Sequence, residues 1–422
     1  MMHATTTAQP QTSPPSDTSV TTVLIADTLA EFGLDALRKA GCHVRVQADL
    51  TADTLADAVR AYDPDALIVR STKVPADVFS AATRLSLVIR AGAGTDTIDI
   101  EAASAQGISV SNCPGMNAVA VAELTWGLIL ACDRNIPAQD ADLREGTWAK
   151  KTWSKAHGLC GRTIGIVGTG RIGRETARRA AGFGMKVIAW SRSLTQEAAD
   201  AMGVGHCSSL QNLLKMSDVV SLHVAATPET HHLVNADFCA AMRPGAILVN
   251  TTRGSVIDEA ALAQAVQAKG IKVGLDVWAT EPSGGDTDFA NELLALPGVY
   301  GTHHVGASTT QAQDAVAQEA VRIVQTWMAT GDAPNCVNRA QTTPAACLLS
   351  VRHLNRPGVL AHIFMALRSS GLNIEEMENA IFEGGEAACA RIQVDRSVPD
   401  HVLATVREHE SVLSTSLSAI TG

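Results

Sequence analysis

The sequence lacks an excess of basic residues. Its 422 residues contain 33 Lys and Arg against 43 Asp and Glu, which gives a formal net charge of -10. Proteins that bind nucleic acids or anionic membranes usually carry a basic patch, and no basic stripe is visible along this chain. We therefore expect neither nucleic acid nor a membrane as a partner.

The sequence also lacks a hydrophobic run long enough to cross a bilayer. Hydrophobic residues make up 46% of the chain, but none of their runs reaches the ~18 residues of a membrane span. The nine cysteines form no CxxC pair, and many lie in apolar segments, where free thiols behave as small hydrophobic residues. We expect a soluble protein of a reducing compartment, the cytoplasm.

Residues 1–20 lack the marks of a targeting signal. They contain no Lys or Arg and no apolar core segment, so they are typical of neither a signal peptide nor a transit peptide. We expect them to form a disordered tail.

From Thr22 onward, short apolar runs alternate with amphipathic segments. This rhythm predicts a parallel sheet that is covered by helices on both faces. The amphipathic segment 308–330 has an apolar face that could pack back on this sheet. We therefore expect a discontinuous, flavodoxin-like outer domain made of residues 21–117 and 306–335.

A second series of apolar runs begins at Thr163, after a long apolar helix over 117–135. Its strand candidates suffice for a six-stranded, doubly wound, Rossmann-type α/β sheet within residues 118–305. They are residues 163–167, 186–190, 218–224, 246–251, 274–278 and 299–302.

The C-terminal part predicts a third domain. Residues 336–345 lack periodicity and form a linker. The order βαββαβ then predicts, for residues 346–422, a ferredoxin-like sandwich of four antiparallel strands with two helices on one face. The expected strands are 347–353, 373–383, 386–395 and 412–420, and the expected helices are 357–371 and 399–410.

A glycine-rich turn follows the first strand of the second series. Gly168, Gly170 and Gly173 form GxGxxG between the strand TIGIV and a helical segment. The first glycine permits the tight turn, the second lets the backbone approach a pyrophosphate, and the third allows close helix packing. This context predicts dinucleotide binding.

The tip of the next strand bears on which dinucleotide binds. An acidic residue that binds the ribose hydroxyls is expected about 20 residues after the turn, but Ser191 and Arg192 stand there. Arg192 could neutralise the 2'-phosphate of NADP, or it could be an ordinary surface charge beside bound NAD. Both interpretations stay open.

Polar residues follow three strands of the second series, in segments 250–258, 274–282 and 300–309. The carboxyl ends of parallel strands are where such folds place their chemistry. Interconverting a 2-hydroxy and a 2-oxo acid needs a cation for the carboxylate and an acid–base group. Arg253 and His304 could supply these groups, and Glu281 could orient the imidazole.

These motifs together resemble the D-isomer-specific 2-hydroxyacid dehydrogenases over about residues 22–335. The shared features are the GxGxxG turn, an Arg in a TxRG segment, an EP segment and a late His before GxxT. The resemblance implies that Arg253 binds substrate and stabilises charge, that Glu281 is the carboxylate partner, and that His304 is the acid–base group. The implied cofactor is NAD, with NADP or dual use left open, and the implied cofactor-binding residues are Gly168, Gly170, Arg171, Ile172, Gly173, Ser191, Arg192, Thr252 and Asp276, the last near the nicotinamide.

Further segments resemble the branch of this family that acts on a phosphorylated 2-hydroxy acid. These segments are 68–74, 90–99, 112–123 and 146–175. The resemblance implies NAD-dependent oxidation of 3-phospho-D-glycerate to 3-phosphohydroxypyruvate, at the entry to serine synthesis, with Lys150 or Lys151 helping to attract the substrate. The implied substrate-binding residues, in the outer domain, are Arg70, Ser71, Gly92, Ala93, Gly94 and Asn117.

The third domain resembles the ACT regulatory domains of that branch, through HLNRPGVL (353–360) and GLNI (371–374). The resemblance implies that His353, Asn355 and Asn373 bind serine as an effector. Exposed edge strands of such domains can pair between subunits, so we expect a homodimer or homotetramer.

Two other functions remain possible from the sequence. One is reduction of glyoxylate or hydroxypyruvate, which an NADP-like tip at Ser191 and Arg192 would suit. The other is an NAD(H)-sensing corepressor-like binding protein, in which the dinucleotide controls assembly rather than turnover. No metal site is expected in either case.

Overall fold

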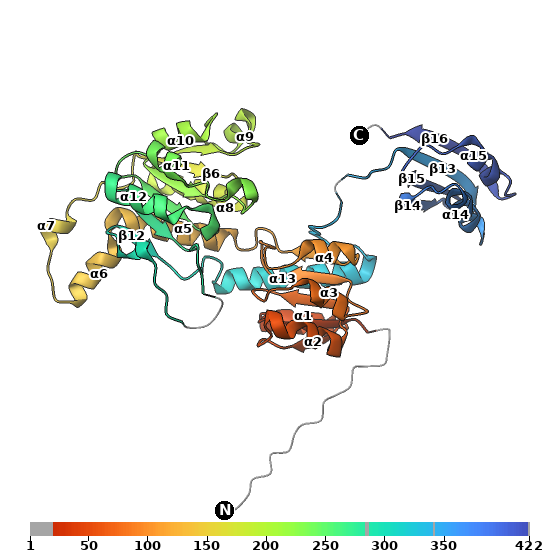
Figure 1. Cartoon of the computed structure of the whole chain (residues 1–422), viewed down its shortest axis with the longest axis horizontal. Coiled ribbons are helices and arrows are strands. Elements are labelled where there is room, and N and C mark those ends of the chain that lie inside the picture. Colours follow the sequence, from red (N-terminus) through yellow and green to blue (C-terminus); the bar gives the residue numbers. More distant parts are fainter. Residues whose placement is uncertain (1–19, 283–286, 341, 421–422) are drawn as a thin grey trace, which may run out of the picture. The chain divides into compact units, whose positions relative to one another are not determined.

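The structure is a computed structural model that describes residues 20–282, 287–340 and 342–420. It divides the chain into an N-terminal unit, Met1–Asn338, and a C-terminal unit, Arg339–Gly422. Figure 1 shows the elements of both units. Apart from Val20, the tail predicted over 1–20 lies outside the described residues.

The first sheet of the N-terminal unit is parallel, as predicted, and has five strands in the order β2-β1-β3-β4-β5. Successive residues of its strands point to opposite faces, so the inner strands β1, β3 and β4 contribute to two apolar cores. On one face, Leu24 packs with α2, α3 and α4, and on the other, Val23 and Ile25 pack with α1 and α13. The strands are β1 (Thr22–Ile25), β2 (His43–Val46), β3 (Ala66–Val69), β4 (Leu87–Arg90) and β5 (Ser109–Asn112), and the helices are α1 (Glu31–Lys39), α2 (Ala52–Tyr62), α3 (Ala76–Ala81), α4 (Ile100–Ala105) and α13 (Thr310–Thr330).

The return of the late helix α13 to this sheet matches the expectation from its apolar face. Its buried residues Ala320, Ile323 and Val324 lie in the same core as Val23 and Ile25. The first sheet is therefore completed by a segment from the far end of the N-terminal unit.

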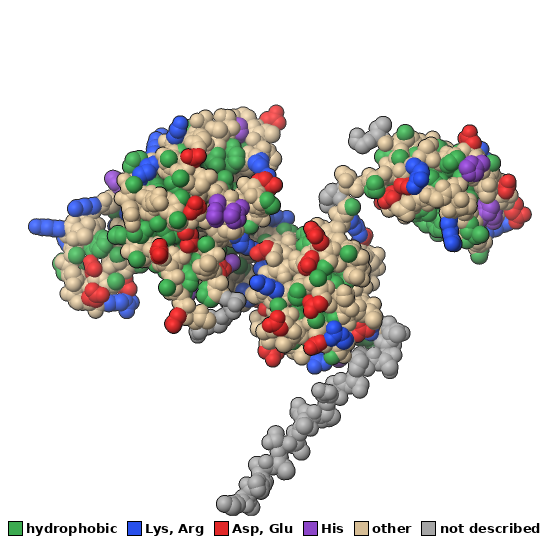
Figure 2. Space-filling view, viewed as in Figure 1, with side chains coloured by type: hydrophobic (Ala, Val, Ile, Leu, Met, Phe, Trp, Pro, Cys, Tyr) green, Lys and Arg blue, Asp and Glu red, His purple; other side chains and the backbone are tan. Residues whose placement is uncertain are grey.

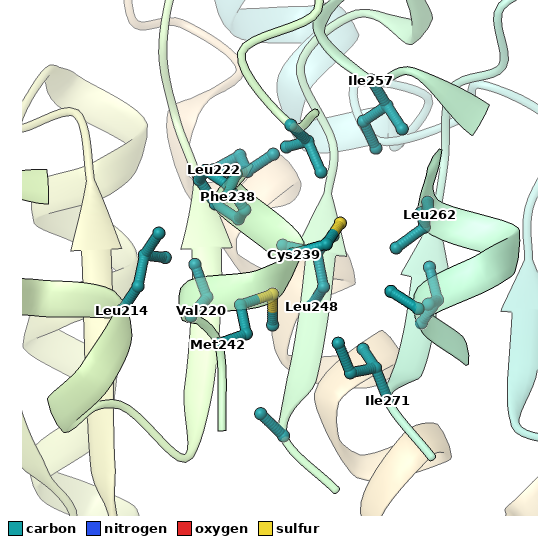
Figure 3. Close-up of a cluster of buried hydrophobic side chains, with 14 of the residues drawn as sticks. Leu214, Val220, Leu222, Phe238, Cys239, Met242, Leu248, Ile257, Leu262 and Ile271 are labelled. Atoms are coloured by element: carbon teal, nitrogen blue, oxygen red, sulfur yellow. The ribbon is translucent and has the colours of Figure 1, made fainter. Parts of the chain in front are cut away.

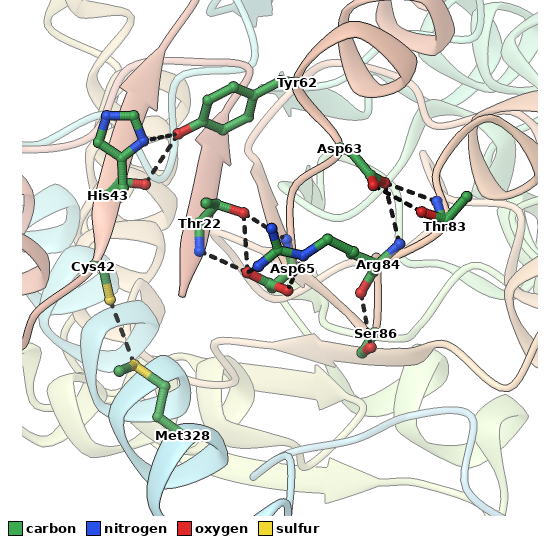
Figure 4. A network of polar contacts seen from close by, with 10 residues as sticks. All are labelled: Thr22, Cys42, His43, Tyr62, Asp63, Asp65, Thr83, Arg84, Ser86 and Met328. Atoms are coloured by element: carbon green, nitrogen blue, oxygen red, sulfur yellow. Dashed lines mark hydrogen bonds and ion pairs between the residues drawn. The ribbon is translucent and has the colours of Figure 1, made fainter. Parts of the chain in front are cut away.

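A polar network ties the amino ends of the first sheet together (Figure 4). The carboxylate of Asp65 accepts hydrogen bonds from the Thr22 N–H at 2.7 Å and from Arg84 Nη2 at 2.7 Å. Nearby, Asp63 accepts a bond of 2.7 Å from the Thr83 hydroxyl. Because these contacts hold the amino ends, the opposite, carboxyl ends remain available for a site.

The second sheet is also parallel and has seven strands, in the order β12-β11-β10-β9-β6-β7-β8. The six predicted strands are present. The prediction missed β8, because a two-residue strand has no apolar run to detect. The strands are β6 (Thr163–Val167), β7 (Lys186–Trp190), β8 (Gly205–His206), β9 (Val219–Leu222), β10 (Ile247–Asn250), β11 (Lys272–Leu275) and β12 (Val299–Gly301).

Helices cover both faces of the second sheet. Figure 3 shows the core on one face, where Leu248 and Val220 of the strands meet Phe238 and Leu262 of α11 and α12. The α-helices are α5 (Ala118–Arg134), α6 (Ile136–Arg144), α7 (Lys150–Trp153), α8 (Arg171–Ala180), α9 (Gln196–Ala201), α10 (Leu210–Met216), α11 (Ala236–Ala241) and α12 (Glu259–Lys269), and the short 3-10 helices are η1 (Ala181–Phe183), η2 (Pro228–Thr230), η3 (Gly254–Val256) and η4 (Glu292–Ala295).

The strand order of the second sheet creates a crevice at a defined place. From β6 the chain first adds β7 and β8 on one side and then β9 to β12 on the other. In open sheets of this kind, ligands bind outside the carboxyl ends of the strands where the order reverses. Here that place lies between the segments that follow β6 and β9.

The C-terminal unit has the predicted βαββαβ order and one antiparallel sheet, β14-β15-β13-β16. Apolar residues of both helices share a single core with Leu349 and Ile392 of the sheet, so both helices cover the same face. This confirms the ferredoxin-like prediction. The elements are β13 (Cys347–Leu354), α14 (Val359–Ser369), β14 (Ile374–Ile381), β15 (Ala387–Val394), α15 (Asp400–Arg407) and β16 (Val412–Ala419).

The beginning of the linker predicted over 336–345 is attached to the first sheet. Cys336 forms a β-bridge with Ser111, and the Asn338 side chain accepts from Val110 N–H and donates to the Ile108 carbonyl, both at 2.9 Å. A segment of three residues is too short for periodicity to reveal such pairing. The connection between the units therefore begins later than predicted.

Two surface features bear on the predicted partners. On the face shown in Figure 2, Lys and Arg side chains lie scattered among Asp and Glu. Among the described residues, no helix is both long enough and apolar enough to span a membrane.

Candidate active site

The glycine-rich turn between β6 and α8 has the close contacts that its sequence predicts. Gly168 has a φ of +98°, and a Cβ there would lie 2.4 Å from the His223 carbonyl oxygen. A Cβ on Gly173 would lie 2.1 Å from the Gly168 carbonyl oxygen, whereas a Cβ on Gly170 would meet no heavy atom within 4 Å. Gly168 and Gly173 therefore allow close packing of the turn against its neighbours. Gly170 leaves open space before the first turn of α8, where a pyrophosphate would lie.

The other residues predicted around the cofactor lie near this turn, after β10 or, for Asp276, after β11. The Ser191 hydroxyl lies 3.1 Å from the Thr169 hydroxyl, and Arg192 beside it is exposed. Ile172 is half-buried in the first turn of α8, and Arg171 donates a bond of 2.9 Å to the Pro114 carbonyl. The tip of β7 thus carries a hydroxyl joined to the glycine turn and a cation open to solvent.

His304 and Glu281 form a direct pair. The distance from His304 Nδ1 to Glu281 Oε2 is 2.7 Å, and Glu281 Oε1 accepts from the Trp278 N–H at 3.0 Å. Burial acts to raise the pKa of the Glu281 carboxyl, but the hydrogen bonds from His304 and Trp278 outweigh it and hold that pKa below its ordinary value. An ionised Glu281 requires Nδ1 to carry the hydrogen, which leaves Nε2 as the nitrogen for proton exchange.

Asp276 shapes the loop that carries His304. Its buried carboxylate accepts from the Thr302 hydroxyl at 2.6 Å and from the N–H groups of Val305 and Gly306 at 2.9 and 2.8 Å. Its carbonyl oxygen accepts from His304 N–H at 2.7 Å. His304 has a φ of +52°, which a non-glycine residue rarely adopts. These four bonds hold the loop in that conformation.

Arg253 reaches from the second sheet to the first. Its Nη2 and Nε bind the two carboxylate oxygens of Asp96 at 3.0 and 3.2 Å, and its Nη1 donates to the Thr252 carbonyl at 2.8 Å. Asn250 fixes the turn, because its amide binds the Arg253 carbonyl and the Thr252 N–H at 2.9 and 3.0 Å. A Cβ on Gly94 would lie 2.3 Å from Arg253 Nη2. The absence of a side chain at Gly94 therefore lets the Arg253 guanidinium approach the loop after β4.

Sequence reasoning missed Asp96, although it lies in the segment 90–99 that carried the resemblance. It also missed Asp27, which follows β1. One oxygen of Asp27 accepts from the N–H groups of Arg70, Ser71 and Thr72, at 2.6, 3.1 and 3.2 Å. Asp27 therefore fixes the turn that presents the Arg70 and Ser71 side chains.

The remaining predicted substrate residues lie on the loops after β4 and β5. Asn112 donates a bond of 2.6 Å to the Ala93 carbonyl, and a Cβ on Gly92 would collide with the Arg90 guanidinium, 1.5 Å from Nη1. Asn117 is the residue before α5, and its side-chain oxygen is buried without a hydrogen-bond partner among the described residues. Such an oxygen fits a donor on a bound ligand.

A cavity of about 900 Å³ lies beside the His304–Glu281 pair, lined also by Trp278, Phe289 and Thr302.

Lys150 and Lys151 are placed differently from the expectation. They are exposed on α7, which together with α6 projects from the second sheet (Figure 1).

The structure does not bring the three predicted effector residues together within one chain. The ring nitrogens of His353 lie 3.1 Å from the Asn379 side-chain oxygen and 2.8 Å from the Leu354 carbonyl. Asn355 follows the end of β13, whereas Asn373 precedes β14 at the end where β13 begins. Eight residues of strand separate the two ends by about 23 Å. One chain therefore does not hold all three residues at one place, and their predicted role in binding serine stays a prediction.

Comparison with known proteins gives the family context of this site. The profile described as D-isomer specific 2-hydroxyacid dehydrogenase, NAD binding domain, matches residues 126–306. D-3-phosphoglycerate dehydrogenase of Methanocaldococcus jannaschii is 42% identical over 295 residues, which are 69% of this chain and 55% of that protein. Hydroxypyruvate reductase of Thermotoga maritima is 44% identical over 61% of this chain and 82% of that protein.

A solved structure agrees with these relatives. The crystal structure of a Thermus thermophilus protein has a TM-score of 0.67 and 35% identity, and the match covers 75% of this chain and 99% of that one. By contrast, this chain spans little more than half the length of the Methanocaldococcus relative.

Proposed function

Because this chain belongs to the D-isomer-specific 2-hydroxyacid dehydrogenases, we propose that it oxidises 3-phospho-D-glycerate to 3-phosphohydroxypyruvate with NAD. The observation that carries this proposal is the grouping of Arg253, Glu281 and His304 after neighbouring strands of the second sheet, β10 to β12. The 42% identity to a D-3-phosphoglycerate dehydrogenase supports the choice of substrate.

Each group has a role that follows from its contacts. Arg253 binds the substrate carboxylate through its planar fork of N–H groups. His304 Nε2 takes the proton of the C2 hydroxyl as hydride leaves C2, and ionised Glu281 stabilises the imidazolium that forms. The nicotinamide, when bound, supplies the hydride acceptor. The glycine turn fits such a dinucleotide, because Gly170 leaves the space before α8 open.

The substrate phosphate needs further donors and cations. Arg70 and Ser71 lie on the turn held by Asp27 and are available to the phosphate through their side chains, because their N–H groups bind Asp27. The unpartnered side-chain oxygen of Asn117 would accept from a substrate hydroxyl.

A second candidate is reduction of hydroxypyruvate or glyoxylate with NADPH. Exposed Arg192 at the tip of β7 favours it, since a guanidinium there could pair with a 2'-phosphate. The 44% identity to a hydroxypyruvate reductase, of which this chain covers 82%, favours it as well.

The experiment that separates these functions measures initial rates of NAD and NADP reduction at alkaline pH, with 3-phospho-D-glycerate and with D-glycerate. Turnover of the phosphorylated acid with NAD would support the first function. Turnover of only the unphosphorylated acid would support the reductase. Binding of NADH without turnover of either acid would instead indicate a dinucleotide-sensing protein.

We also propose that serine binds between the C-terminal units of two chains. His353 and Asn355 lie at one end of the sheet and Asn373 at the other, so a joint site needs Asn373 from a second copy. Ile381 and Phe382, at the end of the edge strand β14, are 58% and 54% exposed and offer an apolar surface for pairing. This pairing supports a homodimer or homotetramer.

The projecting arm of α6 and α7 supports self-association as well. Neither helix has a buried residue, and the arm exposes Ile136, Leu143 and Trp148, the last at 81%. Exposed apolar clusters of this kind mark interaction surfaces.

The nine cysteines are all free thiols, which fits the reducing conditions of the cytoplasm.

A further inference from the structure

The contact between Arg253 and Asp96 raises a question about substrate binding. Arg253 presents Nε and Nη2 to both oxygens of one carboxylate, at 3.2 and 3.0 Å. This side-by-side pairing is the geometry in which a guanidinium recognises a carboxylate. Its third nitrogen, Nη1, donates to the Thr252 carbonyl. The fork that a substrate carboxylate would use is therefore already filled by a side chain of this protein.

Asp96 is free to leave that position. Its side chain is 57% exposed, whereas that of Arg253 is 31% exposed. Residues 95–97 lie in a loop between β4 and α4, outside any helix or strand. Water reaches both side chains, which screens their attraction and can take over their hydrogen bonds when the pair opens. Breaking the pair therefore costs the fold little.

Arg90 is a second cation near Asp96. Arg90, the last residue of β4, interacts electrostatically with Asp96, Arg253 and Arg70. Its Nε is buried and has no hydrogen-bond partner in the described part of the chain. Burial, followed by the charge of Arg253, lowers the pKa of Arg90. A buried donor without a partner gains from a carboxylate that moves onto it.

We propose that Asp96 is a displaceable counter-ion that makes substrate binding selective for carboxylates. In the free enzyme Asp96 occupies Arg253. A substrate carboxylate displaces it, and Asp96 moves to Arg90, whose Nε has no hydrogen-bond partner among the described residues. A neutral ligand cannot replace Asp96 on Arg253 and is rejected. This inference rests on the proposed function, because it takes Arg253 as the group that binds the acid.

The test replaces Asp96 with Asn, which keeps the size and removes the competing charge. If Asp96 fills Arg253 for most of the time, its removal should lower KM for the acid, and the inhibition constant of malonate, by about three- to tenfold. If Asp96 only orients Arg253, the same substitution should raise both constants. The direction of the change therefore separates displacement from positioning.

Two further variants sharpen the result. Glu101→Gln removes the same charge from an exposed position in the first turn of α4, and we expect no change in either constant. Arg90→Gln removes the second cation, so KM should rise in the native background and should not rise in the Asp96→Asn background. Thermal unfolding of each variant checks that it folds.

Malonate binding to the complex of enzyme and NADH, followed by nucleotide fluorescence, keeps this inference separate from the identity of the substrate. If no acid is turned over, the proposed function fails, yet tighter malonate binding by Asp96→Asn would still support displacement. If the acid is turned over and Asp96→Asn raises KM, displacement is overturned and the proposed function stands. An equal fall of KM in Glu101→Gln would also overturn displacement, because it would show a general charge effect.

Discussion

The second sheet and the C-terminal sheet differ in where they place their sequence motifs. In the second sheet, the segments after β6, β10, β11 and β12 follow parallel strands, so all of them end at one edge of the sheet. In the C-terminal sheet, one motif follows the end of β13 and the other precedes the start of β14, which places them at opposite ends. The parallel sheet therefore brings its motifs together within one chain, whereas the effector site proposed for the antiparallel sheet would take residues from two copies.

The largest expected effect tests the single-chain site. Replacing His304 with Ala removes the group that we propose exchanges a proton with the substrate, so kcat should fall by about 10²- to 10⁴-fold. Binding of NADH, followed by fluorescence, should persist because the glycine turn is untouched. Steady-state rates of acid oxidation with NAD provide the measurement.

His303→Ala is the matched control, because it removes the neighbouring imidazole but leaves the His304–Glu281 pair in place. Its kcat should stay within a few-fold of the native value. If both variants lose activity equally, activity depends on the conformation of the loop and not on the His304 imidazole. The role proposed for His304 in proton exchange then fails.

The next effect concerns the glycine turn. Gly173→Ala places a Cβ 2.1 Å from the Gly168 carbonyl oxygen, so it should destabilise the N-terminal unit by about 1–3 kcal/mol. Gly170→Ala meets no heavy atom within 4 Å, so stability should be retained while the cradle for a pyrophosphate is narrowed. We expect weaker NADH binding for Gly170→Ala.

Urea unfolding followed by tryptophan fluorescence measures the N-terminal unit alone, since all six Trp residues lie before residue 339. Equal stability of the two variants would contradict the packing role of Gly173. Unchanged NADH affinity in Gly170→Ala would contradict the placement of the pyrophosphate.

The same contrast explains what the sequence could and could not predict. The alternation of apolar runs with amphipathic segments predicted both parallel sheets, because central strands such as β1, β3 and β10 are buried on both faces. It missed only the two-residue strand β8. Arg253, Glu281 and His304 were predicted because they lie in polar segments that follow strands and because these segments match the motifs of the family. Asp96 was not, because it pairs with Arg253 across 157 positions, and no local pattern encodes such a contact.

The pH dependence of stability offers an intermediate effect. His223 is half-buried at the crevice, with its Nδ1 buried and without a hydrogen-bond partner among the described residues, and burial lowers its pKa to about 3. Its unfolded pKa is about 6.5, so between these values the unfolded chain binds more protons and stability falls as the pH falls. The expected loss on going from pH 7 to pH 5 is about 2 kcal/mol for this group.

His223→Gln removes this titration and offers an amide in place of the ring nitrogen that lies 2.9 Å from the Ser221 hydroxyl. The pH slope of stability, measured by urea unfolding with tryptophan fluorescence, should be shallower in this variant. An identical slope in both proteins would show that His223 is not kept neutral by burial.

The last prediction tests the two-copy site through a partial recovery of binding. Asn355→Ala should abolish serine binding, and so should Asn373→Ala, because each removes a side chain from every shared site. A mixture of the two variants, unfolded and refolded together, forms mixed dimers in which one site takes Asn355 from one chain and Asn373 from the other. About a quarter of the native number of sites should then return, since half of the dimers are mixed and each of these has one intact site. Titration calorimetry with serine measures that number. Binding by the native protein with no recovery in the mixture would place the effector site within one chain, against the separation of about 23 Å between the ends of β13.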